Sequence, residues 1–271
     1  MTVSFDSGVI ALNQFQQNLN VIGNNIANVN TVGFKSATAN FADTFSQTLG
    51  ANASGSMQVG SGVTTSSITN QFTQGSISGT GVQNDMAVNG NGFFVVRDPT
   101  TGQQYVTRDG KFTTDTSGYL VTSNGMRVQG YSDAGLTTVG DIKIDSNGSA
   151  SAVASYSFDG TGKLTVMLAD TAQTQFTRGQ ILLQNFASPS QLMKAGNNLY
   201  TGLAAAGPLT TPLAPGSNGL GSLTTAALEM SNVDLAVELT SLITTQRAYE
   251  ANGKVITTSD EILQTLVNLK R

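Results

Sequence analysis

Both ends of the sequence carry heptad-spaced apolar residues, and the region between them is rich in Gly, Ser and Thr with β-type patterning. The N-terminal row consists of Phe5, Leu12, Phe15, Leu19, Ile22, Ile26 and Val29. The C-terminal row consists of Leu235, Leu242, Tyr249, Ile256 and Leu263, with a second row at Val255, Ile262, Leu266 and Leu269. These spacings predict two long helices, neither of which can bury its apolar face alone. Each helix needs the other or a neighbouring copy, although an ordinary pair of core helices gives the same pattern.

We expect the first helix to run from about Ser4 to Val29, where Asn28, Asn30 and Gly33 offer stop signals. The last helix is expected to begin at Ser231 or Asn232 and to end near Leu269. Ser231 and Asp234 have the spacing of a capping box, in which two side chains satisfy the first free N–H groups of a helix.

The middle of the chain predicts short strands separated by turns that contain Gly. The expected strands are 86–97, 104–107, 111–114, 119–122, 126–131, 140–144, 151–158, 164–168 and 179–186. The fold class is therefore α+β, with terminal helices that pair like a coiled coil, an irregular linker and an antiparallel all-β domain. We predict a helical domain from 1–30 plus 231–271, an extended linker at 31–80 and a β domain at 81–230. The linker is expected to order against neighbouring subunits.

Composition argues against several classes of function. Charged residues make up 11% of the chain and the net charge is −4, so no charge run favours a nucleic acid or an anionic membrane as partner. The sequence has no His and no Cys, which removes the commonest general base, metal ligands and thiol nucleophile. We expect no catalytic site, cofactor or metal. A secreted carbohydrate-binding or carbohydrate-active protein, using paired carboxylates of the β domain, is the alternative from another class.

The first basic residue is Lys35, so the sequence shows no cleavable signal peptide of the Sec type. No apolar run approaches the roughly 18 residues that a membrane-spanning helix requires. A chain of this kind that leaves the cell is expected to use a different export route, without signal cleavage and without membrane insertion.

Residues 27–35, Ala-Asn-Val-Asn-Thr-Val-Gly-Phe-Lys, closely resemble the signature of the bacterial flagellar hook and rod proteins. Its landmark residues here are Ala27, Asn28, Thr31, Gly33, Phe34 and Lys35. Further similar segments follow in the family's order at 85–88, 90–94, 105–112, 231–235 and 246–249. Within the family, residues 128–131 and 263–269 look more like the hook protein, whereas the short chain lacks room for the outer domain that hook proteins commonly carry.

The resemblance implies a non-enzymatic subunit of a hollow helical polymer in the flagellum, in the hook or the basal body. The leading hypothesis is a hook subunit that transmits motor torque as a flexible joint; the alternative is a distal rod subunit. Implied partners are further copies of the chain, the rod, hook-cap and hook-filament junction proteins, and the flagellar type III export apparatus. The pair Phe41 and Phe45 resembles an export recognition element of hook subunits, although simple packing is the other interpretation.

Overall fold

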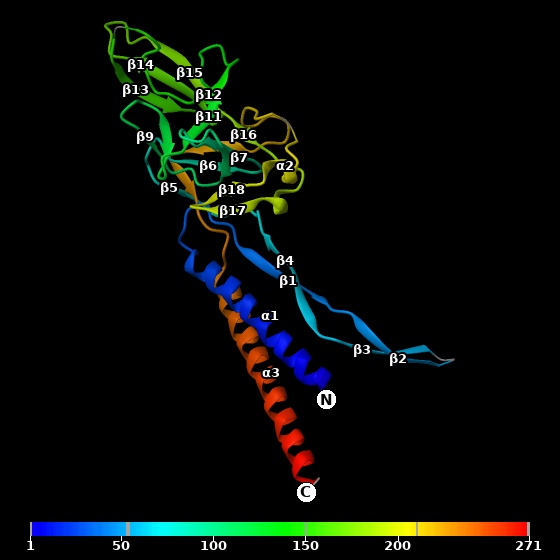
Figure 1. Ribbon diagram of the computed structural model, residues 1–271. Coiled ribbons are helices and arrows are strands. Elements are labelled where there is room, and N and C mark those ends of the chain that lie inside the picture. Colours follow the sequence, from blue (N-terminus) through cyan, green and yellow to red (C-terminus); the bar gives the residue numbers. More distant parts are fainter. Residues whose placement is uncertain (1, 53–54, 150, 210, 270–271) are drawn as a thin grey trace. The chain divides into compact units, whose positions relative to one another are not determined.

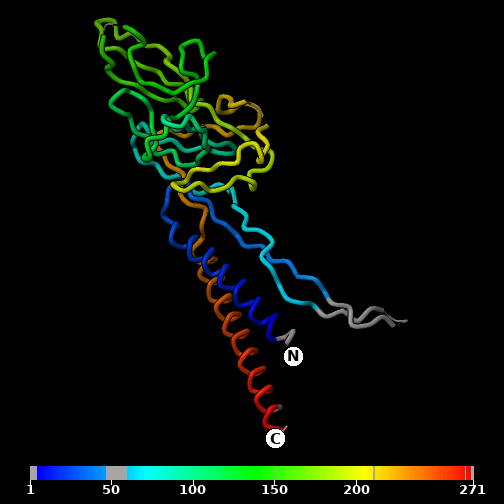
Figure 2. Tube along the Cα trace, in the orientation of Figure 1, coloured from blue at the N-terminus to red at the C-terminus, as the bar shows by residue number. Residues whose placement is uncertain are grey.

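A computed structural model describes residues 2–52, 55–149, 151–209 and 211–269. The chain divides into two compact units, which Figure 2 follows along the Cα trace. Unit 1 comprises Met1–Val29, Ser36–Gln71 and Val233–Arg271, and unit 2 comprises Asn30–Lys35 and Phe72–Asn232. Helices and an antiparallel sheet occupy separate parts of the chain, so the predicted α+β class is confirmed.

Unit 1 contains two long helices and two β ribbons (Figure 1). The helices are α1 (Thr2–Ala27) and α3 (Leu235–Leu269), with 26 and 35 residues. The ribbons pair β1 (Ala37–Asp43) with β4 (Val63–Asn70), and β2 (Ser46–Asn52) with β3 (Gly55–Gly60). At 1.5 Å per residue the helices are roughly 39 and 52 Å long. The two long helices predicted from the terminal heptads are therefore confirmed.

The last helix begins later than the sequence pattern predicts. Asp234 Oδ1 accepts hydrogen bonds from the backbone N–H groups of Ala236 at 2.8 Å and Val237 at 3.3 Å. Asp234 is therefore the N-cap of α3, and the expected capping box with Ser231 as its first residue is wrong. A carboxylate at the N-cap satisfies two free donors and also complements the positive end of the helix dipole.

Unit 2 is built on a 12-stranded sheet in which all paired strands are antiparallel. Its strands are β7 (Phe93–Arg97), β8 (Gln104–Thr107), β9 (Phe112–Thr114), β10 (Leu120–Thr122), β11 (Arg127–Tyr131), β12 (Val139–Asp141), β13 (Val153–Phe158), β14 (Lys163–Leu168), β15 (Gln175–Ile181), β16 (Leu183–Gln184), β17 (Met193–Gly196) and β18 (Leu199–Thr201). Two small ribbons pair β5 (Ile77–Gly79) with β20 (Ala227–Glu229), and β6 (Met86–Asn89) with β19 (Ser222–Thr225). The short helices are η1 (Pro189–Gln191) and α2 (Leu203–Ala206).

Strand β7 has a hydrophobic core on each of its faces. Phe94 and Val96 belong to the larger core, whereas Phe93 and Val95 belong to the smaller one. Alternate residues of a strand point to opposite faces, so a strand covered on both sides reads as a continuous apolar run. In the larger core, the rings of Phe94 and Phe112 pack edge to face with centroids 5.1 Å apart. This explains why residues 93–96 lack polar alternation.

Two of the expected strands are each divided in the structure. The predicted strand 86–97 becomes β6 and β7, because Gly90 and Gly92 adopt φ angles of +108° and +127°. A Cβ at Gly90 would lie 3.0 Å from Gly221 Cα, so the break also allows two backbones to approach closely. The predicted strand 179–186 corresponds to the end of β15 followed by β16, which pairs with β7.

We predict that the turn that begins at Asp133 in unit 2 loses stability in acid. Its carboxylate accepts hydrogen bonds from Thr137 N, Thr137 Oγ1 and Thr138 N, which lower the Asp133 pKa from 3.8 to about 2. Because the folded-state pKa is depressed, this stabilisation is present above pH 3.8 and is lost as pH falls through about 2. We expect an NMR titration of the Asp133 carboxyl carbon to have its midpoint near 2. The Asp133→Asn variant should lose less stability on acidification than the parent, and equal losses would contradict this role.

Candidate assembly surface

The helix pair of unit 1 buries little apolar surface. Among the buried apolar side chains that the structure describes, Ile22 alone belongs to unit 1. Of the other predicted assembly residues, Leu12, Phe15, Leu19, Ile26, Leu242 and Ile256 are partly exposed, and Phe5, Leu235, Tyr249 and Leu263 are exposed. Helices that leave most of their apolar residues in water are typical of chains that bury them against a further partner.

Both apolar rows of α3 contain exposed residues, and Ile256 is one that α1 covers in part. Ile256, in the first row, faces α1, because a Cβ added at Gly8 would lie 3.2 Å from Ile256 Cγ1. In the second row Val255 and Ile262 are 46% and 51% exposed. Leu269 is exposed as well, and the side chain of Leu266 lies outside the described part of the chain. The second row is therefore apolar surface that unit 1 itself leaves uncovered, together with Leu235, Tyr249 and Leu263 of the first row.

The structure separates the environments of Phe41 and Phe45. Phe41 lies on β1 and packs edge to face with Phe15 of α1, with ring centroids 6.5 Å apart. Phe45 lies between β1 and β2 and is 95% exposed. The two rings therefore do not pack together on one helix. Phe45 is exposed and accessible to another molecule. Their predicted role in export stays a prediction.

The signature residues 27–35 span the passage from unit 1 to unit 2. Ala27 is the last residue of α1, and Asn28 Nδ2 donates to Asn24 O at 2.9 Å. Within unit 2, the Gly33 N–H donates to Glu229 O at 2.8 Å. Val32 O and Lys35 O accept hydrogen bonds from Asn198 Nδ2 and Lys194 Nζ, and the Lys194 ammonium lies 4.3 Å from the centre of the Phe34 ring. Thr31 is partly exposed. The second half of the signature is thus fastened to unit 2 by its backbone.

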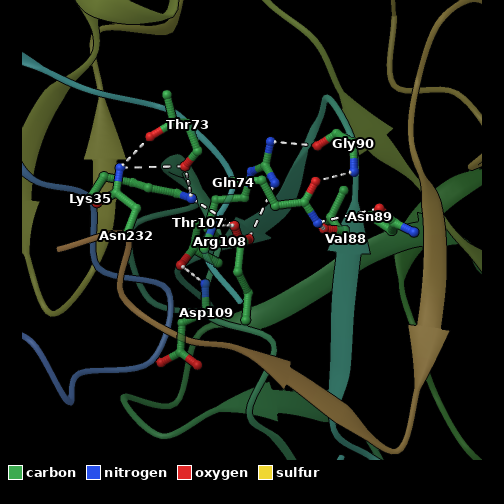
Figure 3. Close-up of polar contacts among 12 residues, drawn as sticks. Lys35, Thr73, Gln74, Val88, Asn89, Gly90, Thr107, Arg108, Asp109 and Asn232 are labelled. Atoms are coloured by element: carbon green, nitrogen blue, oxygen red, sulfur yellow. Dashed lines mark hydrogen bonds and ion pairs between the residues drawn. The ribbon is translucent and has the colours of Figure 1, made fainter. Parts of the chain in front are cut away.

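Lys35 lies in a buried cluster of charges in unit 2 (Figure 3). Its Nζ is 2.7 Å from Glu229 Oε1, and both side chains are completely buried. Arg108 Nη1 approaches Glu229 Oε2 at 3.2 Å, so one carboxylate serves two cations. Lys35 Nζ also donates to Thr73 O at 2.7 Å, and the Gly75 N–H donates to Glu229 Oε1 at 3.0 Å. The cluster joins four parts of the chain that are far apart in sequence.

In this cluster the negative charge of Glu229 offsets the cost of burying the positive charges of Lys35 and Arg108. Burial lowers the pKa of Lys35, and the adjacent Glu229 carboxylate opposes that shift by attraction and hydrogen bonding. Arg108 also donates through Nη2 to Gly90 O at 2.9 Å, and its guanidinium carbon lies 5.0 Å from the centre of the Phe93 ring. Removing one partner of a buried ion pair typically costs about 3–5 kcal/mol, because the remaining charge stays buried.

Sequence analysis did not find this arrangement. Arg108 lies in a family-like segment, but nothing in the sequence links it to Lys35 or Glu229. The available signal was the isolation of Glu229, which is a single acid within the apolar stretch Ala226–Met230. A lone charge inside an apolar strand indicates a buried partner.

Several carboxylates of unit 2 serve their own turns. Asp98, Asp133, Asp159 and Asp170 each accept hydrogen bonds from a Thr hydroxyl and from backbone N–H groups a few residues further on. This is the usual way in which Asp stabilises a turn. Within the described residues, no group of three or more His, Cys, Asp or Glu side chains could hold a metal ion. Among the helices described, none has the length and apolar character needed to cross a membrane.

Fold and site together define an α+β protein whose long terminal helices leave much of their apolar surface exposed. Comparison with protein families gives three matches along the chain. Residues 5–35 match the flagella basal body rod protein model, and residues 87–166 match the D1 domain of the flagellar hook protein FlgE/F/G. Residues 224–269 match the C-terminal model of the flagellar basal body rod FlgEFG proteins.

Full-length relatives agree with these matches. The flagellar basal-body rod protein FlgG of Bacillus subtilis is 41% identical over 279 positions that cover 100% of both chains. FlgG of Buchnera aphidicola subsp. Baizongia pistaciae is 40% identical over 93% of both chains. The flagellar hook protein FlgE of Salmonella typhimurium is 28% identical, over 414 positions that cover 99% of this chain and 100% of the hook protein. The chain belongs to the flagellar rod and hook protein family, a family of structural components rather than enzymes.

These relatives favour the rod over the hook. The alignment with the hook protein is longer than the 271 residues of this chain, so that relative contains additional sequence. The hook hypothesis depended on the similarity of two short segments, residues 128–131 and 263–269, to hook proteins. Identity over the whole chain is higher to rod proteins than to the hook protein. The alternative that the sequence analysis kept, a distal rod subunit, fits the comparisons better.

A substitution at Gly33 tests how closely the signature must approach unit 2. Gly33 has φ +66°, and an added Cβ would lie 2.6 Å from Asp109 N. Gly102 has φ +72° but nothing within 4 Å, so Gly102→Ala adds a left-handed alanine without the clash. We expect Gly102→Ala to lower the free energy of unfolding by about 1 kcal/mol and Gly33→Ala by about 3 kcal/mol or more. Chemical denaturation followed by circular dichroism measures the free energy of unfolding of both variants. Equal losses would show that the close approach of Gly33 to Asp109 does not affect stability.

Proposed function

We propose that the protein is a distal rod subunit of the bacterial flagellum, which polymerises into a straight shaft that transmits motor torque. The observation that carries the proposal is the 41% identity to a basal-body rod protein over the whole chain, against 28% to a hook protein. The partners under this proposal are further copies of the chain and the neighbouring rod and hook proteins. Its location is the flagellar basal body, reached through the flagellar type III export apparatus without a cleaved signal.

The two units suit different tasks in such a polymer. Unit 2 has two apolar cores and a buried charge cluster, so it buries much of its apolar and charged side-chain surface within one chain. Unit 1 has an apolar face on α3 that its own elements leave exposed. We propose that copies bury these faces against one another, and that the ribbons within 31–80, which carry Phe45 and the 53% exposed Ile68, order against neighbouring subunits. The predicted division of the chain into a helical domain at 1–30 plus 231–271, a linker at 31–80 and a β domain at 81–230 stays a prediction.

Electron microscopy of the polymer tests the rod proposal directly. Purified chains are concentrated until they polymerise, or flagellar basal bodies that carry a tagged copy are isolated. A rigid, straight polymer is expected, located within the basal body. Persistent supercoiled curvature, or a label that lies in the hook, would overturn the rod proposal and return the hook as the better interpretation.

Charge substitutions in the exposed row of α3 test the assembly surface. We expect Val255→Asp and Ile262→Asp to reduce polymerisation at least tenfold, because assembly would then bury an unpaired carboxylate at a cost of several kcal/mol. Both side chains are about half exposed, so the soluble chain should keep its helix content. Thr258→Asp adds the same charge at an exposed position of the same helix and serves as control. Light scattering measures polymerisation, and normal assembly of both variants would show that this row is not the contact.

The double variant Phe41→Ala with Phe45→Ala tests the proposed export role. The two rings supply few core contacts, since Phe41 is 40% and Phe45 is 95% exposed. We therefore expect secretion to fall severalfold while the free energy of unfolding changes by less than about 1 kcal/mol. Ile68→Ala removes an exposed apolar side chain from β4 and is the matched control. Unchanged secretion with a large loss of stability would favour packing as the role of the pair.

A further inference from the structure

The contacts between α1 and α3 follow one antiparallel register. Gly8 faces Ile256, Asn18 Nδ2 donates to Thr245 Oγ1 at 3.2 Å, and Asn25 Nδ2 donates to Glu238 Oε1 at 2.9 Å. The residue number falls along α3 as it rises along α1, so the helices run in opposite directions. Asn18 and Asn25 are one heptad apart on α1, and Thr245 and Glu238 are one heptad apart on α3. The pair therefore contains two successive polar layers.

Asn25 uses its side-chain amide fully. Besides its bond to Glu238, its Nδ2 donates to Ala37 O at 2.9 Å, and its Oδ1 accepts from the Ala37 N–H at 3.0 Å. Asn25 is only 2% exposed, so its amide has little access to water. Both amide protons and the oxygen are thus satisfied by α3 and by the first residue of β1. A single side chain fixes the end of α1 against two other elements of unit 1.

The buried positions of this helix pair include polar residues beside the apolar Ile22, unlike the apolar seam of an ordinary coiled coil. Asn25 and Thr245 are buried, whereas the apolar Val255 and Ile262 are about half exposed. Apolar seams bind strongly but tolerate a shift by one heptad, while a buried polar layer is satisfied in one register only. A shift of α3 by one heptad would bring Asn25 opposite Thr245 and leave Glu238 without its amide partner. The polar layers therefore discriminate between registers more than they add affinity.

We propose that the layers Asn18–Thr245 and Asn25–Glu238 determine the register of the α1/α3 pair, and thereby decide which apolar residues a second copy of the chain meets. The register itself is a property of the single chain. Only its consequence for a second copy rests on the proposed function. In this proposal, polar contacts within the chain set the register of the helix pair, and apolar contacts between chains supply the affinity of assembly.

Cysteine cross-linking tests the register directly, because the natural chain contains no Cys. Gly8→Cys with Ile256→Cys reports the native register, and Gly8→Cys with Leu263→Cys reports a shift by one heptad. Each pair is placed in the full chain, oxidised at low concentration, and scored as intramolecular product by gel mobility and mass spectrometry. In the parent we expect the native pair to form at least tenfold more product than the shifted pair. Adding Asn25→Leu and Glu238→Leu should raise the shifted product about tenfold.

A matched control separates register from helix stability. A Cβ at Gly253 would meet nothing within 4 Å, so Gly253→Ala favours the helix without touching a neighbour. This control should keep the native cross-link alone. If the Leu variant loses its helical circular dichroism, Asn18→Leu with Thr245→Val tests the other layer by the same readout. A shifted product that stays at the parental level in folded variants would overturn the proposal.

Polymerisation of the same variants distinguishes the two proposals. If the register depends on the polar layers but the parent forms no rod, the register proposal stands and the rod proposal fails. If the parent forms straight rods and the Leu variant also forms normal rods in the native register, the rod proposal stands and the register proposal fails. Expected together are normal rods from the parent and from Gly253→Ala, and irregular or absent polymer from the Leu variant.

Discussion

The Glu229 carboxylate is the interaction on which the organisation of unit 2 most depends. It neutralises Lys35, pairs with Arg108 and accepts the Gly75 N–H, while the Glu229 backbone carbonyl accepts from Gly33. Each of these segments except that of Arg108 lies within a few residues of a point where the chain passes between the units, at 29–30, 35–36, 71–72 and 232–233. Glu229 therefore contacts the unit 2 side of all four passages, through its carboxylate and its backbone carbonyl.

The two units solve the problem of burial in different ways. Strand β7 is covered on both faces, so unit 2 gains two apolar cores around one continuous strand. In unit 1 the helices bury Asn25 and Thr245 and leave Val255 and Ile262 in water. A unit of the first kind buries its apolar residues within a single chain. A unit of the second kind is specific in geometry but poor in buried apolar area, which fits a chain that belongs to a family of flagellar structural proteins.

Resemblance to the family was visible in residues 27–35, yet the choice between hook and rod required comparison of whole chains. Short segments such as 128–131 lie in strands whose side chains are set by packing, so different family members can share them. The structure also gives the signature a physical role that its residues alone do not show. Gly33 is required by a close approach to Asp109, and Lys35 by the charge of Glu229.

Local pattern was sufficient for the elements that depend on nearby residues. The heptads of 5–29 and 235–269 determined two long helices, because helical periodicity depends on residues only three or four positions apart. Turn residues likewise located most of the strands, including β8 at 104–107. Only the tertiary structure decided that Ile256 of α3 faces α1 and that Lys35, Arg108 and Glu229 share one buried site. Those outcomes depend on contacts between residues far apart in sequence, 194 positions for Lys35 and Glu229, and no local spacing specifies such partners.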